Sequence, residues 1–512
     1  MFSKFLSNNR SNILLLIALI VYNSLFFSER FGINILLFIV LILGFQYFLF
    51  KESFKSRNVL ISAGLTLFTA AMIVWHNSLL SKWMFFISYA VTLGFILQSR
   101  IRFIGYSMLT AASNFTKIPV EFFSWNKVPG TTNHRKLRIS RVLMLSGLPV
   151  IIVIIFFMIY RVSNPMFANF TDRFFEEIGA WFQNIFRHIS FVRILFILSG
   201  IILLSALLFN RGYHVFAREE EQFNDKISRK RRALRWPFLR LDFRNEYLSG
   251  IILLVMMNLL LLVLNIIDIK YIWISFKIPA GVSLSEMVHH GTEWLIVSII
   301  LSMVVLIYLF RANQNFYSGN KWLKYLAYAW MLQNMVLTVS LLVRNNTYVS
   351  WHALAYKRLG VYVFIALTFI GLITMLIKIY GSKSFFYLLR VNSWAAIFMM
   401  CGVCSINWDI FIAKYNVEFS DGANLDTDFL LKLSPKSYPY ILEKMDKVTK
   451  QIDAHDQSTY GKKLLYFNTE GFESELERRS LRYIAERSEN TWYSYNVSDQ
   501  YAIEYLKNKY TR

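Results

Sequence analysis

Long, continuous apolar runs are the feature that most constrains the fold of this chain. The 512 residues are 55% hydrophobic. Most apolar side chains fall in runs of roughly 18 to 22 residues, the length that a helix needs to cross ~30 Å of hydrocarbon. The runs are continuous and do not alternate, which disfavours an outer-membrane barrel. The sequence therefore predicts an all-α, polytopic transmembrane helix bundle.

Eleven spans are predicted along the chain. The first is read as a retained span, because no small-residue cleavage site follows it and another apolar run comes at once. The predicted spans are 11–28, 32–50, 59–76, 83–99, 141–160, 191–210, 247–267, 291–311, 322–343, 359–379 and 385–406. We expect three regions: a four-span region over 1–140, a seven-span core over 141–406, and a soluble helical tail over 407–512.

The formal net charge of +23 is interpreted as topology and not as nucleic-acid binding. Residues 407–512 carry 15 Lys+Arg and 17 Asp+Glu, so the excess of positive charge lies in the membrane region. The loops after spans two, four and six are basic, and basic loops mark the cytoplasmic side. With eleven spans, the N-terminus is expected in the cytoplasm and the tail outside it.

The basic loop over 211–246 contains the cluster Arg229–Arg232. Two interpretations of this cluster remain open. It is a binding site for anionic lipid headgroups, each cation contributing ~1 kcal/mol near the surface, or it only anchors the topology.

An amphipathic helix is predicted over 164–190, opened by Asn164-Pro165. Its aromatic and aliphatic side chains recur at steps of three and four, and it is too polar to span a bilayer, so we expect it in the outer interface. It either caps the bundle or acts as a lid over an external site.

Span seven carries Asn258, Asn265 and Asp268 on one helical face. Polar groups inside a bilayer tend to face another helix or a cavity. We favour hydrogen bonding between helices over a transport path, and we expect Asp268 at the outer end of the span. Span eight opens on Glu286, His289, His290 and Glu293, a spacing compatible with a metal but more typical of a solvated helix start.

A polar turn over 344–360 separates spans nine and ten. It concentrates basic and aromatic side chains on the expected outer face, where Arg344 or Arg358 could pair with Asp409 or Glu286. The candidate polar site comprises Arg344, Tyr348, His352, Tyr356, Arg358, Glu286, His289, Asp409, Asn258 and Asn265. The bland alternative is a set of interfacial anchors that provides a docking surface for the tail.

The tail is predicted to form short helices over 425–433, 473–487 and 498–509, with a further helix starting at Ser434-Pro435 and an aromatic turn at 492–496. Cys401 and Cys404 form a Cys-Gly-Val-Cys inside an apolar run. They are read as buried thiols, because a redox or zinc site needs an activated thiolate or further ligands.

Several segments together resemble an uncharacterised family of bacterial multi-pass membrane proteins, domain of unknown function 4173. The similar segments are Arg344 with Tyr348, then 355–362, 164–167, 407–416, 425–433 and 492–496. The family's Gly-Leu-Thr is replaced here by Ala353-Leu354-Ala355. The resemblance covers about residue 140 to the end, and it implies a bacterial integral membrane protein without bringing an activity, a cofactor or a catalytic residue.

No P-loop, dinucleotide fingerprint, nucleophile elbow or HExxH motif occurs. No catalytic residue, cofactor or metal is therefore assigned. Three classes remain: an envelope scaffold or sensor whose tail binds a protein partner, a transporter or lipid-handling protein with a polar cavity, and a membrane-embedded transferase at the outer polar site. The first is favoured.

Overall fold

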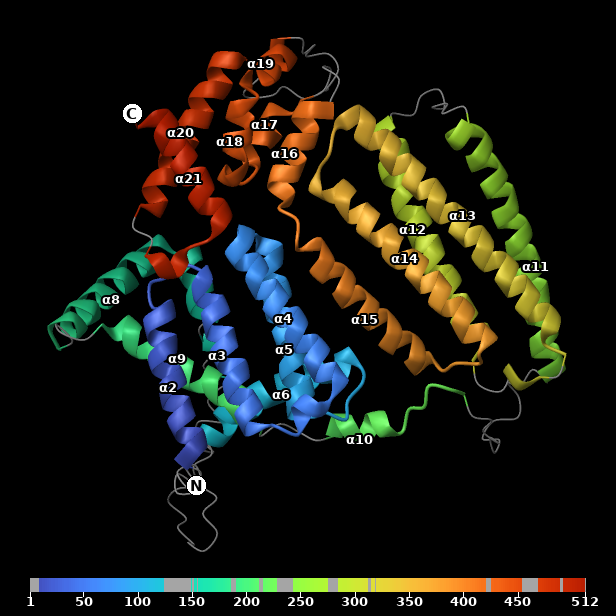
Figure 1. Cartoon of the computed structure of the whole chain (residues 1–512), viewed down its shortest axis with the longest axis horizontal. Helices are drawn as coiled ribbons and strands as arrows, with labels where there is room; N and C mark the ends of the chain where they lie inside the picture. The colour runs from blue at the N-terminus through green and yellow to red at the C-terminus, as the bar shows by residue number, and fades with distance from the viewer. Residues whose placement is uncertain are drawn as a thin grey trace, which may run out of the picture. The chain divides into compact units, whose positions relative to one another are not determined.

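A computed structural model describes most of the chain. The described residues are 9–123, 149, 152–153, 155–185, 190–210, 215–227, 243–274, 284–311, 315–317, 319–419, 425–453, 468–488 and 491–511. Side chains are described for these residues except 9–10, 118–123, 178–185, 243, 284–292 and 419. The described residues are almost entirely helical, as predicted (Figure 1).

The chain divides into two compact units. The first comprises 1–67, 89–101 and 106–216, and the second comprises 68–88, 102–105 and 217–512. Two of the boundaries fall inside the helices α4 (Arg57–His76) and α5 (Leu79–Leu97).

In the first unit, α2 (Asn9–Phe26) packs against α3 (Ile33–Leu49) and α9 (Phe191–Leu208). The rings of Tyr22 and Phe196 stack at 4.5 Å between α2 and α9. Between α3 and α9, the buried amide of Gln46 donates to the carbonyl of Leu207 at 3.0 Å. A buried polar side chain thus joins two apolar helices.

The helix α6 (Ile104–Phe123) was not predicted, since polar residues interrupt its apolar side chains. Those polar groups are used inside the first unit. Asn114 donates to the carbonyls of Ala206 and Phe209 at 2.6 and 2.8 Å, which satisfies the C-terminal end of α9.

The predicted amphipathic helix is α8 (Pro165–Ile185). The Asn164 side chain accepts from the amides of Met166 and Phe167, so it caps the helix N-terminus. Met166, Phe170 and Phe174 are exposed. Its position relative to a membrane stays a prediction.

In the second unit, five long helices follow one another. They are α11 (Phe243–Asp268), α12 (Leu284–Leu309), α13 (Lys321–His352), α14 (Tyr356–Tyr380) and α15 (Phe385–Val403). A π-helix, Ile269–Ile274, continues α11. The helix α13 packs against α11, α12 and α14, and α14 packs against α15 (Figure 1). Leu323, Ala327 and Trp330 on α13 are among the buried side chains that fill the space between these helices.

Seven described helices are long and apolar enough to cross a membrane. They are Arg57–His76, Leu79–Leu97, Phe191–Leu208, Arg244–Ile274, Lys321–His352, Tyr356–Tyr380 and Phe385–Val403. Three shorter apolar helices, Ser11–Phe26, Ile33–Leu49 and Glu293–Leu309, coincide with three more predicted spans. The predicted span 141–160 lies mostly outside the described residues. The chain is a helical membrane protein.

A helical module follows α15 in the second unit. Its elements are α16 (Trp408–Phe419), α17 (Thr427–Lys432), η5 (Pro435–Ser437), α18 (Tyr438–Glu443), α19 (Met445–Asp453), α20 (Thr469–Arg487), η6 (Trp492–Ser494) and α21 (Val497–Tyr510). We call residues 408–510 the C-terminal module. Side-chain caps from Asp426, Asn468 and Asn496 begin α17, α20 and α21.

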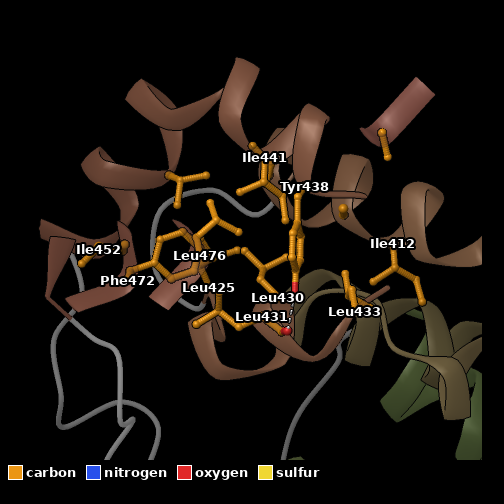
Figure 2. Packing of buried hydrophobic residues seen from close by; sticks show 14 of the residues in the cluster. Ile412, Leu425, Leu430, Leu431, Leu433, Tyr438, Ile441, Ile452, Phe472 and Leu476 are labelled. Carbon is orange, nitrogen blue, oxygen red and sulfur yellow. Dashed lines mark hydrogen bonds between the residues drawn. The ribbon is translucent and has the colours of Figure 1, made fainter. Parts of the chain in front are cut away.

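The module has its own apolar core (Figure 2). Leu430, Ile441, Phe472, Leu476 and Leu506 are fully buried in it. The Tyr438 ring lies in the same cluster, and its hydroxyl donates to the carbonyl of Leu431 at 3.0 Å. The cluster extends onto the end of α13, which joins the module to the membrane helices of the second unit.

The module's stability should fall in acid because of Glu475 on α20. Hydrogen bonds from Arg478 and Arg479 lower the pKa of this carboxyl to about 2, against the opposing effect of burial. A depressed pKa contributes stability above the unfolded value of about 4.5, and that stability is lost as pH falls towards 2. We expect the protection factors of the amides in α20 and α21 of the full chain, the observed exchange rates relative to the intrinsic rates at each pH, to fall over this window.

In a Glu475→Gln variant this part of the pH dependence should disappear. Glu477→Gln removes the same charge from an exposed position on the same helix, so it should leave the acid response of α20 unchanged. Equal responses of both variants would contradict the assignment.

Candidate functional site

A line of polar side chains joins α11 to α13 within the second unit. Gln333 on α13 donates to the Asn258 Oδ1 at 2.8 Å, and Asn258 donates to the carbonyl of Leu326 at 3.1 Å. Asn265, seven residues further along α11, donates to the carbonyl of Gln333 at 3.1 Å. We call this line the polar seam. The predicted hydrogen bonding between helices is therefore present at both asparagines.

The seam continues to a buried ion pair between Asp268 and Arg344. An Arg344 Nη donates to Asp268 Oδ1 at 2.7 Å, and the Ser340 hydroxyl donates to Oδ2 at 2.5 Å. Only 4% of the Asp268 side chain and 10% of the Arg344 side chain are exposed. Asp268 is therefore buried and paired at the end of α11, and its location on the outer side of the membrane stays a prediction.

This ion pair lies where α11 changes to a π-helix. Asp268 is the last residue of the α-helix, and Ile269 begins the π-helix. Wide turns of this kind occur often at functional sites. The Arg344 Nε is buried without a hydrogen-bond acceptor among the described residues. A buried charge pair and a change of helix type thus coincide inside the membrane helices.

Arg358, at the start of α14, satisfies the C-terminal end of α13. Its Nη1 donates to the carbonyl of His352 at 2.5 Å and also to the carbonyl of Ala353. Its guanidinium lies 4.5 Å from the ring centroid of Tyr348, which also stacks on His352 at 4.5 Å. A cation at a helix C-terminus interacts favourably with the last carbonyls and with the helix dipole. These contacts give Arg358 a structural role in the basic turn 344–360.

Ala353 ends α13 with a backbone conformation that suits glycine. Its φ is 60° and its ψ is −172°, a region that side-chain-bearing residues occupy at a cost of about 1–3 kcal/mol.

Ala353→Gly is therefore expected to raise the free energy of unfolding by about 1 kcal/mol, because relief of strain outweighs the extra freedom of the unfolded chain. Thermal unfolding of the full chain in detergent measures this. The same substitution at Ala329, exposed inside α13, should lower stability by about 1 kcal/mol. Destabilisation by both variants would contradict the strain at Ala353.

Asp409 and Asn416 attach the C-terminal module to the turn. Asp409 Oδ1 accepts from the Tyr356 hydroxyl at 2.5 Å and from the Ser434 amide at 2.8 Å. Asn416 accepts from the amide of Leu354 at 2.7 Å and donates to its carbonyl at 3.0 Å. Asp409 thus joins Tyr356 of α14 to Ser434 at the start of η5. Arg344 pairs with Asp268 and not with Asp409.

Glu286 and His289 are the remaining residues of the predicted candidate site. The side chains of Glu286 and His289 lie outside the described ones, although their backbone belongs to α12. The part of the chain that is described contains no cluster of three or more His, Cys, Asp or Glu side chains placed to hold a metal. Cys401 and Cys404 are buried free thiols.

Sequence reasoning missed a second buried charge network, centred on Asp499 of α21. Lys436 lies 3.2 Å from this carboxylate, Arg487 also pairs with it, and the Tyr483 hydroxyl donates to it at 2.8 Å. Burial raises the pKa of Asp499, but Lys436, Asn496 and Arg487 outweigh it and hold that pKa below its usual value. The available sequence signal was only the Asn496 cap and Asp499 three residues later, the spacing of a helix start.

Lys436 also binds the turn between α4 and α5. Its Nζ donates to the carbonyls of His76 at 2.5 Å and Asn77 at 3.1 Å. Asn77 has a positive φ of 47°, a conformation that asparagine adopts more readily than most residues. All of these residues belong to the second unit.

One comparison assigns the chain to a family of unknown function. Residues 59–444 match the family described as Domain of unknown function (DUF4153), and the chain belongs to this family. The number 4173 named in the sequence analysis is not the one matched. No curated protein and no solved structure matches the chain.

Proposed function

We propose that the chain is a scaffold or sensor in the bacterial cytoplasmic membrane, whose C-terminal module binds a protein partner. The observation that carries this proposal is the module itself, which has a buried core and is joined to the second unit's membrane helices by Asp409, Asn416 and Lys436. A module fixed in this way presents a defined surface. In the polar seam, in contrast, most of the polar groups already form hydrogen bonds between α11 and α13.

The orientation is part of the proposal. The basic loops support a cytoplasmic N-terminus and an extracytoplasmic module. Arg229–Arg232 lie outside the described residues, and binding of anionic headgroups there stays a proposal. Reporters fused after Arg512 and inserted near Ser228 should report opposite sides of the membrane, and signals from the same side would refute this orientation.

Complementation of a strain lacking the protein tests the scaffold function. One set of variants replaces exposed module charges, Arg482→Ala and Glu486→Ala. The other replaces the seam by apolar side chains, Asn258→Leu with Gln333→Leu. For a scaffold, the first set should lose the cellular phenotype and the second should keep it, with both sets folded. The reverse pattern would refute the scaffold.

A transporter is the second candidate, because a buried ion pair within membrane helices marks many ion and substrate paths. The coincidence of Asp268, Arg344 and the π-helix favours it. Loss of the phenotype in a folded chain without this charge pair would support transport. A transferase at the outer polar site has no comparable support among the described side chains.

A further inference from the structure

The turn between α20 and α21 carries large aromatic side chains that the module core leaves uncovered. We call Trp492, Tyr493 and Tyr495 the aromatic turn. Trp492 is 63% exposed and Tyr495 is 43% exposed. The Trp492 ring packs on Tyr493 at 4.2 Å between centroids, so the pair presents one aromatic surface.

The aromatic turn lies at the end of a membrane-spanning helix. Ser498, three residues after Tyr495, donates its hydroxyl to the carbonyl of Trp75 at 3.1 Å. Trp75 is the residue before the last of α4, a candidate span. Lys436 reaches the next two carbonyls, of His76 and Asn77. These hydrogen bonds hold the start of α21, and with it the aromatic turn, next to the C-terminal end of α4.

The membrane helices carry exposed tryptophans at the same place. Trp75 on α4 is 60% exposed, and Trp83 on the first turns of α5 is 61% exposed. Tryptophan and tyrosine concentrate where hydrocarbon meets headgroups, because the ring is apolar and the N–H or O–H needs a polar partner. The two helices thus mark the bilayer interface next to the module.

We propose that the aromatic turn inserts into the phospholipid headgroup layer beside α4 and α5, so that the C-terminal module lies on the membrane surface. The occupant of this surface is the bilayer that holds the spans. The lipid is recognised by its chemistry: glycerol and headgroup oxygens accept from the indole N–H and the phenol O–H, while the rings replace water at the acyl boundary. This placement does not depend on the proposed scaffold function.

Site-directed fluorescence quenching in the full chain tests the insertion. A fluorophore is attached at Trp492→Cys in a background with Cys401→Ala and Cys404→Ala, reconstituted into phosphatidylcholine vesicles. The quenchers are a headgroup spin-labelled lipid and aqueous iodide. Glu473→Cys is the matched control, because Glu473 is exposed on α20 about 21 Å from Arg487 at the turn end of that helix.

Insertion predicts several-fold stronger quenching by the spin-labelled lipid at 492 than at 473, with the opposite order for iodide. Equal iodide access at both sites without lipid quenching would overturn the proposal. Shielding of residue 492 from both quenchers would also overturn it, because a protein surface would then cover the turn. Tyr495→Cys repeats the measurement if Trp492→Cys does not fold.

Discussion

Asp268→Ala is expected to lower the free energy of unfolding by about 3–5 kcal/mol, because Arg344 keeps a buried charge without its carboxylate. Arg344→Ala should cost a similar amount for the converse reason. Unfolding of the full chain in detergent, followed by thermal midpoint or denaturant titration, measures both. Ser340→Ala is the control, since it removes one hydrogen bond to the same carboxylate and should cost only about 1–3 kcal/mol.

The double variant Asp268→Leu with Arg344→Met should recover most of this loss. Replacing a buried ion pair by apolar side chains of similar volume is often neutral or stabilising, because no charge then has to leave water. A double variant as unstable as either single variant would contradict the pairing. A folded double variant that fails to complement would show that the charges act in function, which favours the transporter.

The second large effect is expected at Lys436. Lys436→Met should destabilise docking of the module by about 3 kcal/mol or more, because Asp499 loses one of its two cations and two buried carbonyls lose their donor. Amide exchange is the measurement. It should speed up in α21 and in the turn around Asn77 together.

Lys432→Met is the matched control for this substitution. Lys432 lies four residues earlier in the module and is exposed, so its loss should change stability by no more than about 0.5 kcal/mol. Faster exchange in α21 without a change near Asn77 would mean that Lys436 serves only the module core. Similar effects of both methionine variants would contradict a buried role for Lys436.

Positions of the membrane helices were predictable because each apolar run carries its own signal. A membrane span must be a helix or a strand of a closed barrel, and continuous apolar runs favour the helix, so the runs at 322–343, 359–379 and 385–406 correspond directly to α13, α14 and α15. The helix α6 shows the limit of this reasoning. Its serine, threonine and asparagine side chains lower the local hydropathy, yet they satisfy backbone carbonyls elsewhere in the first unit.

Partners within the candidate site were not predictable from a single sequence. Several carboxylates were possible partners for Arg344. Its pairing with Asp268, 76 residues earlier in the sequence, depends on the packing of α11 against α13. Arg358 donates to the carbonyls that end α13, so its guanidinium is bound without a carboxylate partner. In the sequence, Lys436 looks like a surface lysine that follows a proline. It is buried only because the folded chain brings the turn at His76-Asn77 and Asp499 of α21 against it.

The contact between Lys436 and the turn at His76-Asn77 also sets an order of events during biosynthesis. The ribosome makes this turn early, whereas Lys436 and Asp499 are made only after α11 to α15. The carbonyls of His76 and Asn77 therefore lack the hydrogen bonds from Lys436 until the later spans have been made. Docking of the module then reports that the membrane helices of the second unit are in place, and a protease that attacks the undocked module would remove chains whose insertion failed.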